Sequence, residues 1–205
     1  MSARLARCRG LLDDLGLDGV VVCEAADVRY LCGFRGEDAT LIIGRDAALI
    51  CTDARYWEQV SEETVGFELV EALGADLIAD TAAAAAERLG ADARLGFQGA
   101  SLSYEEHRRL RRRHRGRLRD VGGRVSRLRA VKDAAEIAVM RRAGALTDEA
   151  LAAVVGRGLV GRREADGPGT SSPSITGWAP TAKPSRRSSR AARTAPRRTR
   201  FPGSG

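Results

Sequence analysis

Histidine is scarce in this chain of 205 residues: His107 and His114 are the only two, and none follows them. A metal centre or catalytic dyad that draws a histidine from the later part of the chain is therefore excluded. Long apolar runs are also lacking, since none approaches the roughly 18–20 residues that a membrane-spanning helix needs. The first residues lack the continuous apolar segment and cleavage site of a secretory signal. We therefore expect a cytoplasmic protein without a membrane partner.

Cysteine is present but without a motif. Cys8, Cys23, Cys32 and Cys51 all lie in the first quarter of the chain, and no two of them form a C-x-x-C pair. Cys23 and Cys51 lie in apolar runs that are typical of core strands. The spacing favours small buried side chains with free thiols over a metal or redox site.

Lysine is almost absent, at Lys132 and Lys183 only, and the basic charge is carried by arginine. The net charge of +7 is unevenly spread. Residues 157–205 hold eleven basic residues against the two acids Glu164 and Asp166, a net charge of +9. The rest of the chain therefore carries −2, and the excess positive charge belongs to a C-terminal tail.

Residues 27–59 are the stretch around which the chain is organised. Apolar runs at 39–43 and 47–51 flank Gly44-Arg45-Asp46, which is the spacing of a β-hairpin. Before the hairpin, Asp27 is predicted to cap a short helix over 28–31 that Gly33 ends.

A second helix is predicted directly after this hairpin. Thr52 or Asp53 is expected to cap it, and its body is expected over residues 54–60. Further helices are predicted over 2–15, 76–89, 104–114 and 133–155 with a helical turn over 125–128, and further strands over 19–23, 67–70, 94–97 and 117–121. This alternation predicts an α/β domain with a central mixed β-sheet flanked by helices.

The last predicted helix has a capping pattern and one apolar stripe. Asp133 and Glu136 form the D-x-x-E pattern of a helix start. The stripe at period 3.6 consists of Ile137, Met140, Gly144, Thr147, Leu151 and Val154. Gly and Thr interrupt this stripe, so the helix is expected to need a partner surface.

Several short motifs occur in a characteristic order. They are Val28–Phe34, Thr52–Tyr56, Gly96–Tyr104, Leu128–Asp133, Glu136-Ile137 and Thr147–Leu151. Together they resemble the N-terminal domain of the creatinase/prolidase family, which includes the Xaa-Pro aminopeptidases and Xaa-Pro dipeptidases. The resemblance implies a ribonuclease H-like α/β fold, and it fades after about Val155.

Three regions follow from these observations. Residues 1–128 are expected to form the creatinase/prolidase-like N-terminal domain, and residues 129–156 a linker helix toward a catalytic domain. Residues 157–205 are rich in Arg, Ser, Pro and Ala and are expected to be a disordered basic tail. An out-of-frame reading of GC-rich codons would give such a composition, so we hypothesise a truncated or frameshifted peptidase.

The resemblance implies a metal-dependent hydrolysis, but the residues that perform it cannot be identified in this chain. Intact family members hold two divalent cations, such as Mn or Co, in a "pita-bread" domain with two Asp, one His and two Glu. Bridging carboxylates then place the cations so that a shared water attacks the peptide. No catalytic, cofactor-binding or metal-binding residue is assigned to this chain, so we expect no cofactor and no hydrolysis by it alone.

Two other functions remain open at this point. The chain could be a binding or oligomerisation module, because the resembled domain takes part in subunit contacts, which implies a homo-oligomer. It could also bind nucleic acid non-specifically through Arg pairs of the tail, such as Arg186-Arg187. The arginine run at 108–115 is interpreted instead as a solvated helix face with Leu110 turned inward.

Overall fold

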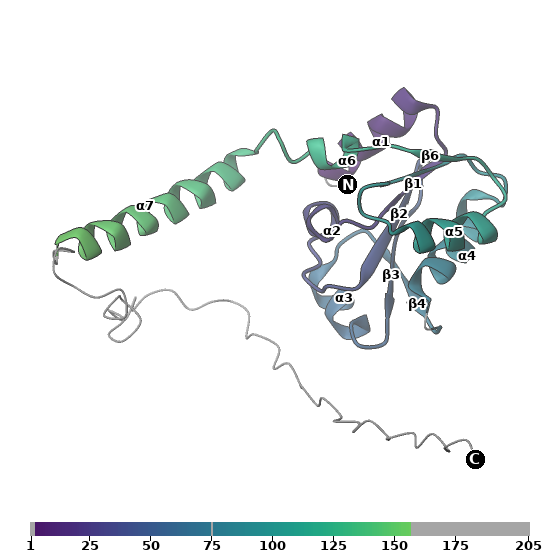
Figure 1. The fold of residues 1–205 in the computed structure, drawn as a ribbon, viewed down its shortest axis with the longest axis horizontal. Coiled ribbons are helices and arrows are strands. Elements are labelled where there is room, and N and C mark those ends of the chain that lie inside the picture. Colours follow the sequence, from purple (N-terminus) through teal and green to yellow (C-terminus); the bar gives the residue numbers. More distant parts are fainter. Residues whose placement is uncertain (1–2, 75, 157–205) are drawn as a thin grey trace, which may run out of the picture. The chain divides into compact units, whose positions relative to one another are not determined.

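The computed structural model of the protein describes residues 3–74 and 76–156 (Figure 1). The helices are α1 (Ala3–Leu15), α2 (Ala25–Cys32), α3 (Trp57–Glu63), α4 (Leu77–Leu89), α5 (Tyr104–Arg113), α6 (Arg124–Arg127) and α7 (Ala134–Gly156). The strands are β1 (Gly19–Val22), β2 (Ala39–Gly44), β3 (Ala48–Asp53), β4 (Glu68–Ala72), β5 (Leu95–Phe97) and β6 (Leu118–Asp120).

The chain divides into two units, residues 1–142 and 143–205, which are described separately. The tail predicted over 157–205 lies outside the described residues. Within the described residues, no helix is long and apolar enough to cross a membrane.

One six-stranded sheet, in the order β4-β3-β2-β1-β5-β6, forms the centre of the first unit. Strands β1, β2 and β3 pair antiparallel, with Leu41 opposite Ile50 in the hairpin. The outer pairs β3–β4, β1–β5 and β5–β6 are parallel. The predicted mixed sheet is therefore confirmed, and β6 lies at one of its edges.

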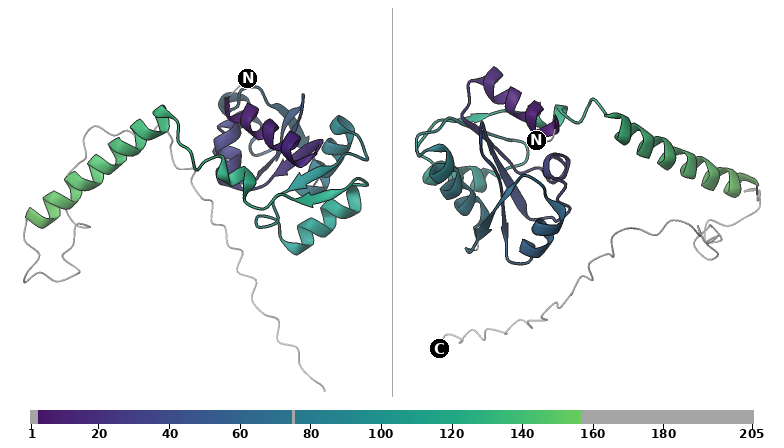
Figure 2. Two further views of the ribbon diagram at one scale, coloured as in Figure 1. Left: turned by 90° about the horizontal axis from the view of Figure 1, so that it is seen from above. Right: turned by 180° about the vertical axis from the view of Figure 1, so that it is seen from behind.

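Helices cover both faces of this sheet (Figure 2). Val20 and Val22 pack with side chains from α1, α2, α3 and α6. Val21, between them, packs on the opposite face against α4, because successive side chains of a strand point to opposite faces. Burial on both faces explains why the central strands appear in the sequence as unbroken apolar runs.

Two predicted helix starts are wrong. In each case a residue that was expected to cap the helix makes a different contact. Helix α2 begins at Ala25 after Glu24, so Asp27 lies inside the helix and is fully buried. Helix α3 begins at Trp57, because Thr52 and Asp53 still belong to β3. The hydroxyl of Thr52 donates to Asp38 O at 2.5 Å instead of capping a helix.

The two capping boxes predicted at Ser103 and Asp133 are confirmed. Ser103 Oγ accepts from the backbone N–H of Glu106 at 3.2 Å, and the Glu106 carboxylate accepts from Ser103 N at 2.7 Å. Asp133 and Glu136 exchange the same two bonds at 2.8 and 2.9 Å. These bonds satisfy backbone donors that the first turn of a helix leaves unpaired. Leu110 is fully buried, as expected.

The four cysteines are free thiols, as their spacing predicts. Cys8, Cys32 and Cys51 are buried, whereas Cys23 is only half-buried, because it follows the last residue of β1. Burial raises the pKa of Cys8 and Cys23 to about 12, and that of Cys32 and Cys51 to about 11. The reactive thiolate is therefore scarce in the folded protein at neutral pH.

We expect these thiols to resist alkylation until the protein unfolds. At pH 7.5, iodoacetamide should modify the native chain at least tenfold more slowly than the same chain in urea, because both the thiolate fraction and access are low. Mass spectrometry of timed samples measures the number of modified cysteines. Rapid native labelling of Cys8, the fully buried thiol of α1, would contradict this expectation.

Candidate functional site

The side chain of Asp27 is the most densely hydrogen-bonded buried charge of the described residues. It is fully buried, and its Oδ2 atom accepts from Gln98 Nε2 and from Ser126 Oγ, each at 2.6 Å. Its Oδ1 atom accepts from Arg129 Nε at 2.6 Å. We refer to Asp27, Gln98, Ser126 and Arg129 as the Asp27 network. A buried carboxylate needs such donors, because removing it from water without them is costly.

Gln98 extends this network to the end of β1. Its Oε1 atom accepts from the backbone N–H groups of Cys23 and Glu24, at 3.0 and 3.1 Å. Because its amide nitrogen donates to Asp27, the side chain bridges the start of α2 and the residues that follow β5. Ser101 adds a parallel bridge, donating from Oγ to the Glu24 carboxylate at 2.9 Å.

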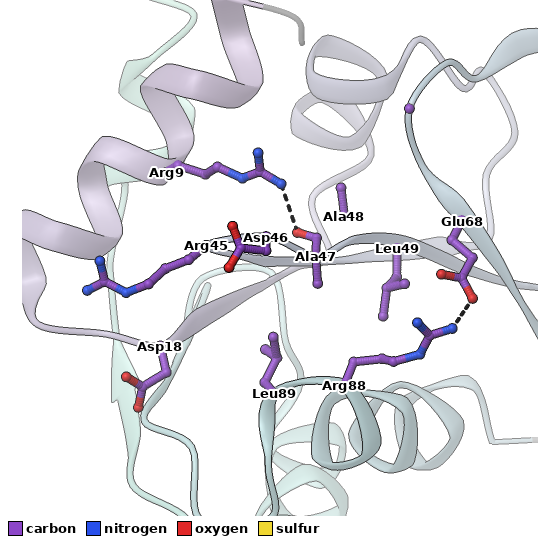
Figure 3. Close-up of a pocket in the computed structure, with 11 residues that line it drawn as sticks. Arg9, Asp18, Arg45, Asp46, Ala47, Ala48, Leu49, Glu68, Arg88 and Leu89 are labelled. Atoms are coloured by element: carbon purple, nitrogen blue, oxygen red, sulfur yellow. Dashed lines mark hydrogen bonds and ion pairs between the residues drawn. The ribbon is translucent and has the colours of Figure 1, made fainter.

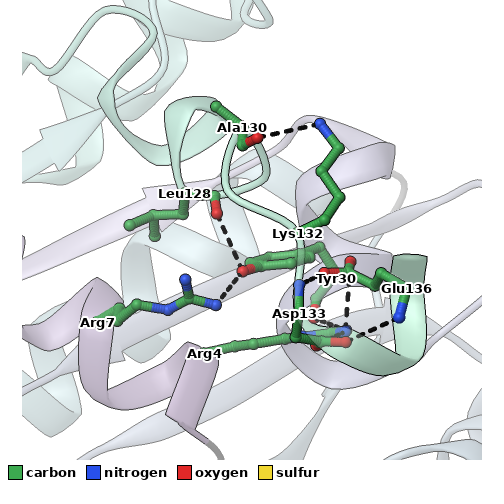
Figure 4. Close-up of polar contacts among 8 residues, drawn as sticks. All are labelled: Arg4, Arg7, Tyr30, Leu128, Ala130, Lys132, Asp133 and Glu136. Atoms are coloured by element: carbon green, nitrogen blue, oxygen red, sulfur yellow. Dashed lines mark hydrogen bonds and ion pairs between the residues drawn. The ribbon is translucent and has the colours of Figure 1, made fainter. Parts of the chain in front are cut away.

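A second network joins α1, α2 and the start of α7 (Figure 4). The hydroxyl of Tyr30 donates to Leu128 O at 3.1 Å and accepts from Arg7 at 2.5 Å. The guanidinium of Arg4 lies 4.5 Å from the centroid of the Tyr30 ring and donates to Tyr30 O at 3.1 Å. We refer to the contacts of Arg4, Arg7 and Tyr30 as the Tyr30 network.

Arg4 also binds the first turn of α7 directly. Its guanidinium lies 2.9 Å from the Asp133 carboxylate and 3.3 Å from that of Glu136. The N–H of Glu136, and then Arg4, lower the pKa of Asp133 below its ordinary value. Both partners of the Arg4–Asp133 pair are partly exposed, so the pair by itself contributes little stability. Its effect is to hold the start of α7 against α1.

The two networks position chain segments. Every oxygen of the Asp27 carboxylate accepts a hydrogen bond, and the group is closed to solvent. The networks act on the segment 124–136, which three side chains of the domain contact: Asp27, Tyr30 and Arg4. Arg7 supports this segment only through the hydroxyl of Tyr30.

A cavity of about 650 Å³ lies elsewhere, between α1, the β2–β3 hairpin and α4 (Figure 3). Three guanidinium groups line it, but each has a partner. Arg9 donates to Gly44 O and Ala47 O, Arg45 pairs with Asp13, and Arg88 pairs with Glu68. The acids Asp18, Asp46 and Glu68 also line the cavity, so its formal charges cancel and it is not built for a single anion.

The two histidines do not offer a metal site. His114 is buried, and its Nε2 donates to Ala93 O at 2.7 Å, while its Nδ1 has no partner among the described residues. The ring of His107 stacks at a tilt on Phe97, with centroids 4.9 Å apart. The described residues contain no group of three or more His, Cys, Asp or Glu side chains that could hold a metal ion.

Comparison with known proteins gives a family match over most of the described chain. The family model described as the creatinase/prolidase N-terminal domain matches residues 4–131. The uncharacterized peptidase YqhT of Bacillus subtilis (strain 168) is 34% identical over 148 residues. That alignment spans 72% of this chain but 41% of YqhT, so the chain spans about two fifths of its relative's length.

Two solved structures extend this likeness to the fold. The Xaa-Pro dipeptidase from Bacillus anthracis matches 75% of this chain and 42% of its own, with a TM-score of 0.69 and 28% identity. The N-terminal domain of the cytoplasmic peptidase PepQ from Mycobacterium tuberculosis H37Rv matches 62% of this chain and 99% of its own, with a TM-score of 0.56 and 25% identity. The second match shows that the region corresponds to a complete domain of a relative.

Proposed function

Because this chain belongs to the creatinase/prolidase N-terminal domain family, we propose that it is the non-catalytic part of an Xaa-Pro peptidase-like protein and does not hydrolyse peptides by itself. The sequence match to YqhT and the structural match to the Xaa-Pro dipeptidase support the assignment to this class. The function of such a domain is to shape and support a larger assembly. The two networks fit this function, because they fix the segment 124–136 that leads out of the domain.

The positions of the two histidines are the observation that supports the lack of hydrolysis. The metal site implied by the family needs a histidine as a neutral nitrogen ligand. Here the Nε2 of His114 is bonded to a backbone carbonyl inside the domain, and His107 packs on Phe97. No other histidine exists in the 205 residues. These residues do not fit a dinuclear metal centre, so we derive no reaction step for this chain.

We expect no release of proline from an Xaa-Pro dipeptide by the purified chain, with or without added Mn²⁺ or Co²⁺. An amino-acid assay after long incubation measures the product, and an intact Xaa-Pro dipeptidase under the same conditions is the positive control. Release that depends on added metal, and that chelation abolishes, would overturn the proposal, because it would require ligands that these residues do not supply.

The predictions for the tail remain predictions. Residues 157–205, with their arginine pairs and the hypothesised change of reading frame, lie outside the described residues. The cytoplasmic location and the non-specific binding of nucleic acid also remain predictions.

A further inference from the structure

Another cavity, of about 380 Å³, lies between the end of α1 and the edge strand β6. Its volume is in the range of small-ligand sites. Three arginines line it and no acid does, in contrast to the cavity beside α4, where acids balance the arginines. The lining residues that concern us are Leu15, Leu17, Arg94, Arg117, Leu118 and Arg119.

Two of the three guanidinium groups are held in place at the turn that follows α1. Arg94 donates from Nε and Nη2 to the Asp18 carboxylate, at 3.0 and 2.7 Å. Its Nη1 atom lies 3.9 Å from the position that a Cβ atom of Gly16 would occupy. Arg119 donates from Nη1 to Leu15 O at 2.9 Å. The two groups therefore flank the same turn, and each keeps N–H donors that these bonds do not use.

Arg117, the third arginine, has no such partner. Its backbone is fixed, because Arg117 O accepts from Leu95 N at 2.8 Å. Its side chain is exposed and has no hydrogen bond or ion pair within the part of the chain that the structure describes. An unpaired guanidinium beside two that are already positioned favours an anionic ligand, since charged donors of this kind bind anions strongly.

The remaining lining residues are apolar. Leu15 and Leu118 are half-buried, and Leu17 is buried. Their side chains come from the end of α1 and from β6, so apolar surface lies next to the arginines within one cavity. Such a combination suits a ligand that has both a charged group and an apolar body.

We propose that this cavity binds a small organic phosphate, in which a phosphomonoester group contacts the arginines and an apolar or aromatic body covers the leucines. The three guanidinium groups together with Asp18 carry a formal charge of about +2, which a phosphomonoester dianion neutralises. Its three outer oxygens can accept from three guanidinium groups. A carboxylate supplies only one charge and two oxygens, and inorganic phosphate has no apolar body.

NMR titration of the whole ¹⁵N-labelled chain with phenyl phosphate tests this site. At pH 7.5 and low ionic strength the probe is mainly a dianion. We expect saturable shifts of the Gly16 and Leu118 amide signals, with a Kd on the order of 1 mM for a ligand of this size. Inorganic phosphate and benzoate should each bind about tenfold more weakly, because each lacks one part of the contact.

Arg117 is the residue to replace, because its side chain makes no contact that supports the fold. Arg117→Gln should raise the Kd for phenyl phosphate about tenfold, since it removes a charged donor. Arg117→Lys keeps the charge without the planar fork and should have a smaller effect. Arg112→Gln is the matched control, because Arg112 is also exposed but lies on α5 and does not line the cavity. It should leave the Kd unchanged, and far-UV circular dichroism checks the helix content of each variant.

Three results would overturn the proposal. The first is the absence of saturable shifts at Gly16 and Leu118, which is expected if the arginines only protect the edge of the sheet from pairing. The second is equal weakening by R117Q and R112Q, which indicates diffuse attraction to a basic surface. The third is equal affinity for phenyl phosphate and inorganic phosphate, which would mean that the leucines make no contact. None of these results bears on hydrolysis, so this proposal and the proposed function fail separately.

Discussion

Replacing Asp27 by alanine is expected to lower the free energy of unfolding by about 3–5 kcal/mol, the cost of removing one partner of a buried charged network. The carboxylate is fully buried and accepts three hydrogen bonds of 2.6 Å. Its loss leaves the donors of Gln98 and Arg129 without their partner and opens a polar cavity. Because a domain of this size is stable by only about 5–15 kcal/mol, the effect should be large.

Urea denaturation followed by far-UV circular dichroism measures this change. Asp14→Ala is the matched control, because Asp14 is exposed and also lies in a helix. That substitution should change the free energy of unfolding by less than about 0.5 kcal/mol. Asp27→Asn, which keeps the shape and removes the charge, should also destabilise the protein, since the asparagine presents donors to donors. A loss below about 1 kcal/mol for Asp27→Ala would show that the network contributes little.

Replacing Phe34 by alanine should have an effect of similar size, about 3–5 kcal/mol, by creating a cavity in the core. The ring is 1% exposed and packs edge-on against Tyr56, with centroids 5.7 Å apart and planes at 87°. Gly36 lies directly against the ring, where any Cβ atom would clash with Phe34. The surrounding chain is therefore shaped around this side chain and has little freedom to fill the space that it leaves.

Thermal and urea unfolding of Phe34→Ala measure the loss, and Tyr104→Ala is the control. Tyr104 is an aromatic side chain of comparable size that is 78% exposed, so its removal should cost less than about 0.5 kcal/mol. Equal destabilisation by the two substitutions would mean that the contribution of Phe34 to the free energy of unfolding does not depend on its burial. Filling the cavity in Phe34→Leu should recover part of the loss.

Most elements of the fold could be predicted from the sequence because their signals are local. The hairpin at Gly44 follows from two apolar runs separated by turn residues, and the capping boxes at Ser103 and Asp133 involve residues only three positions apart. The errors arose where a distant contact competes with a local one. Asp27 stands before an apolar turn like a capping residue, yet its partners Gln98 and Arg129 are 71 and 102 residues away.

The likeness to the creatinase/prolidase family could be seen in the sequence as separate short motifs. The structural role of these motifs could not be seen there. Asp27 directly precedes the first of these motifs, Gln98 lies in the third, and Arg129 lies in the fourth. The structure shows that the three meet at a single carboxylate. A signal for this was present in the sequence: a charged residue in a short helix that is otherwise apolar on that face. Its partners could not be chosen without the fold.

By itself, the sequence determined the alternation of helices and strands, the mixed sheet, the capped start of α7 and the scarcity of histidine. These properties depend on residue type and on neighbours within a few positions, which periodicity and capping chemistry describe well. Only the tertiary structure decided that Asp27, Gln98, Ser126 and Arg129 form one buried network, and that Arg4 holds the start of α7. Contacts between distant segments depend on how the sheet and its helices pack, and no local pattern encodes that.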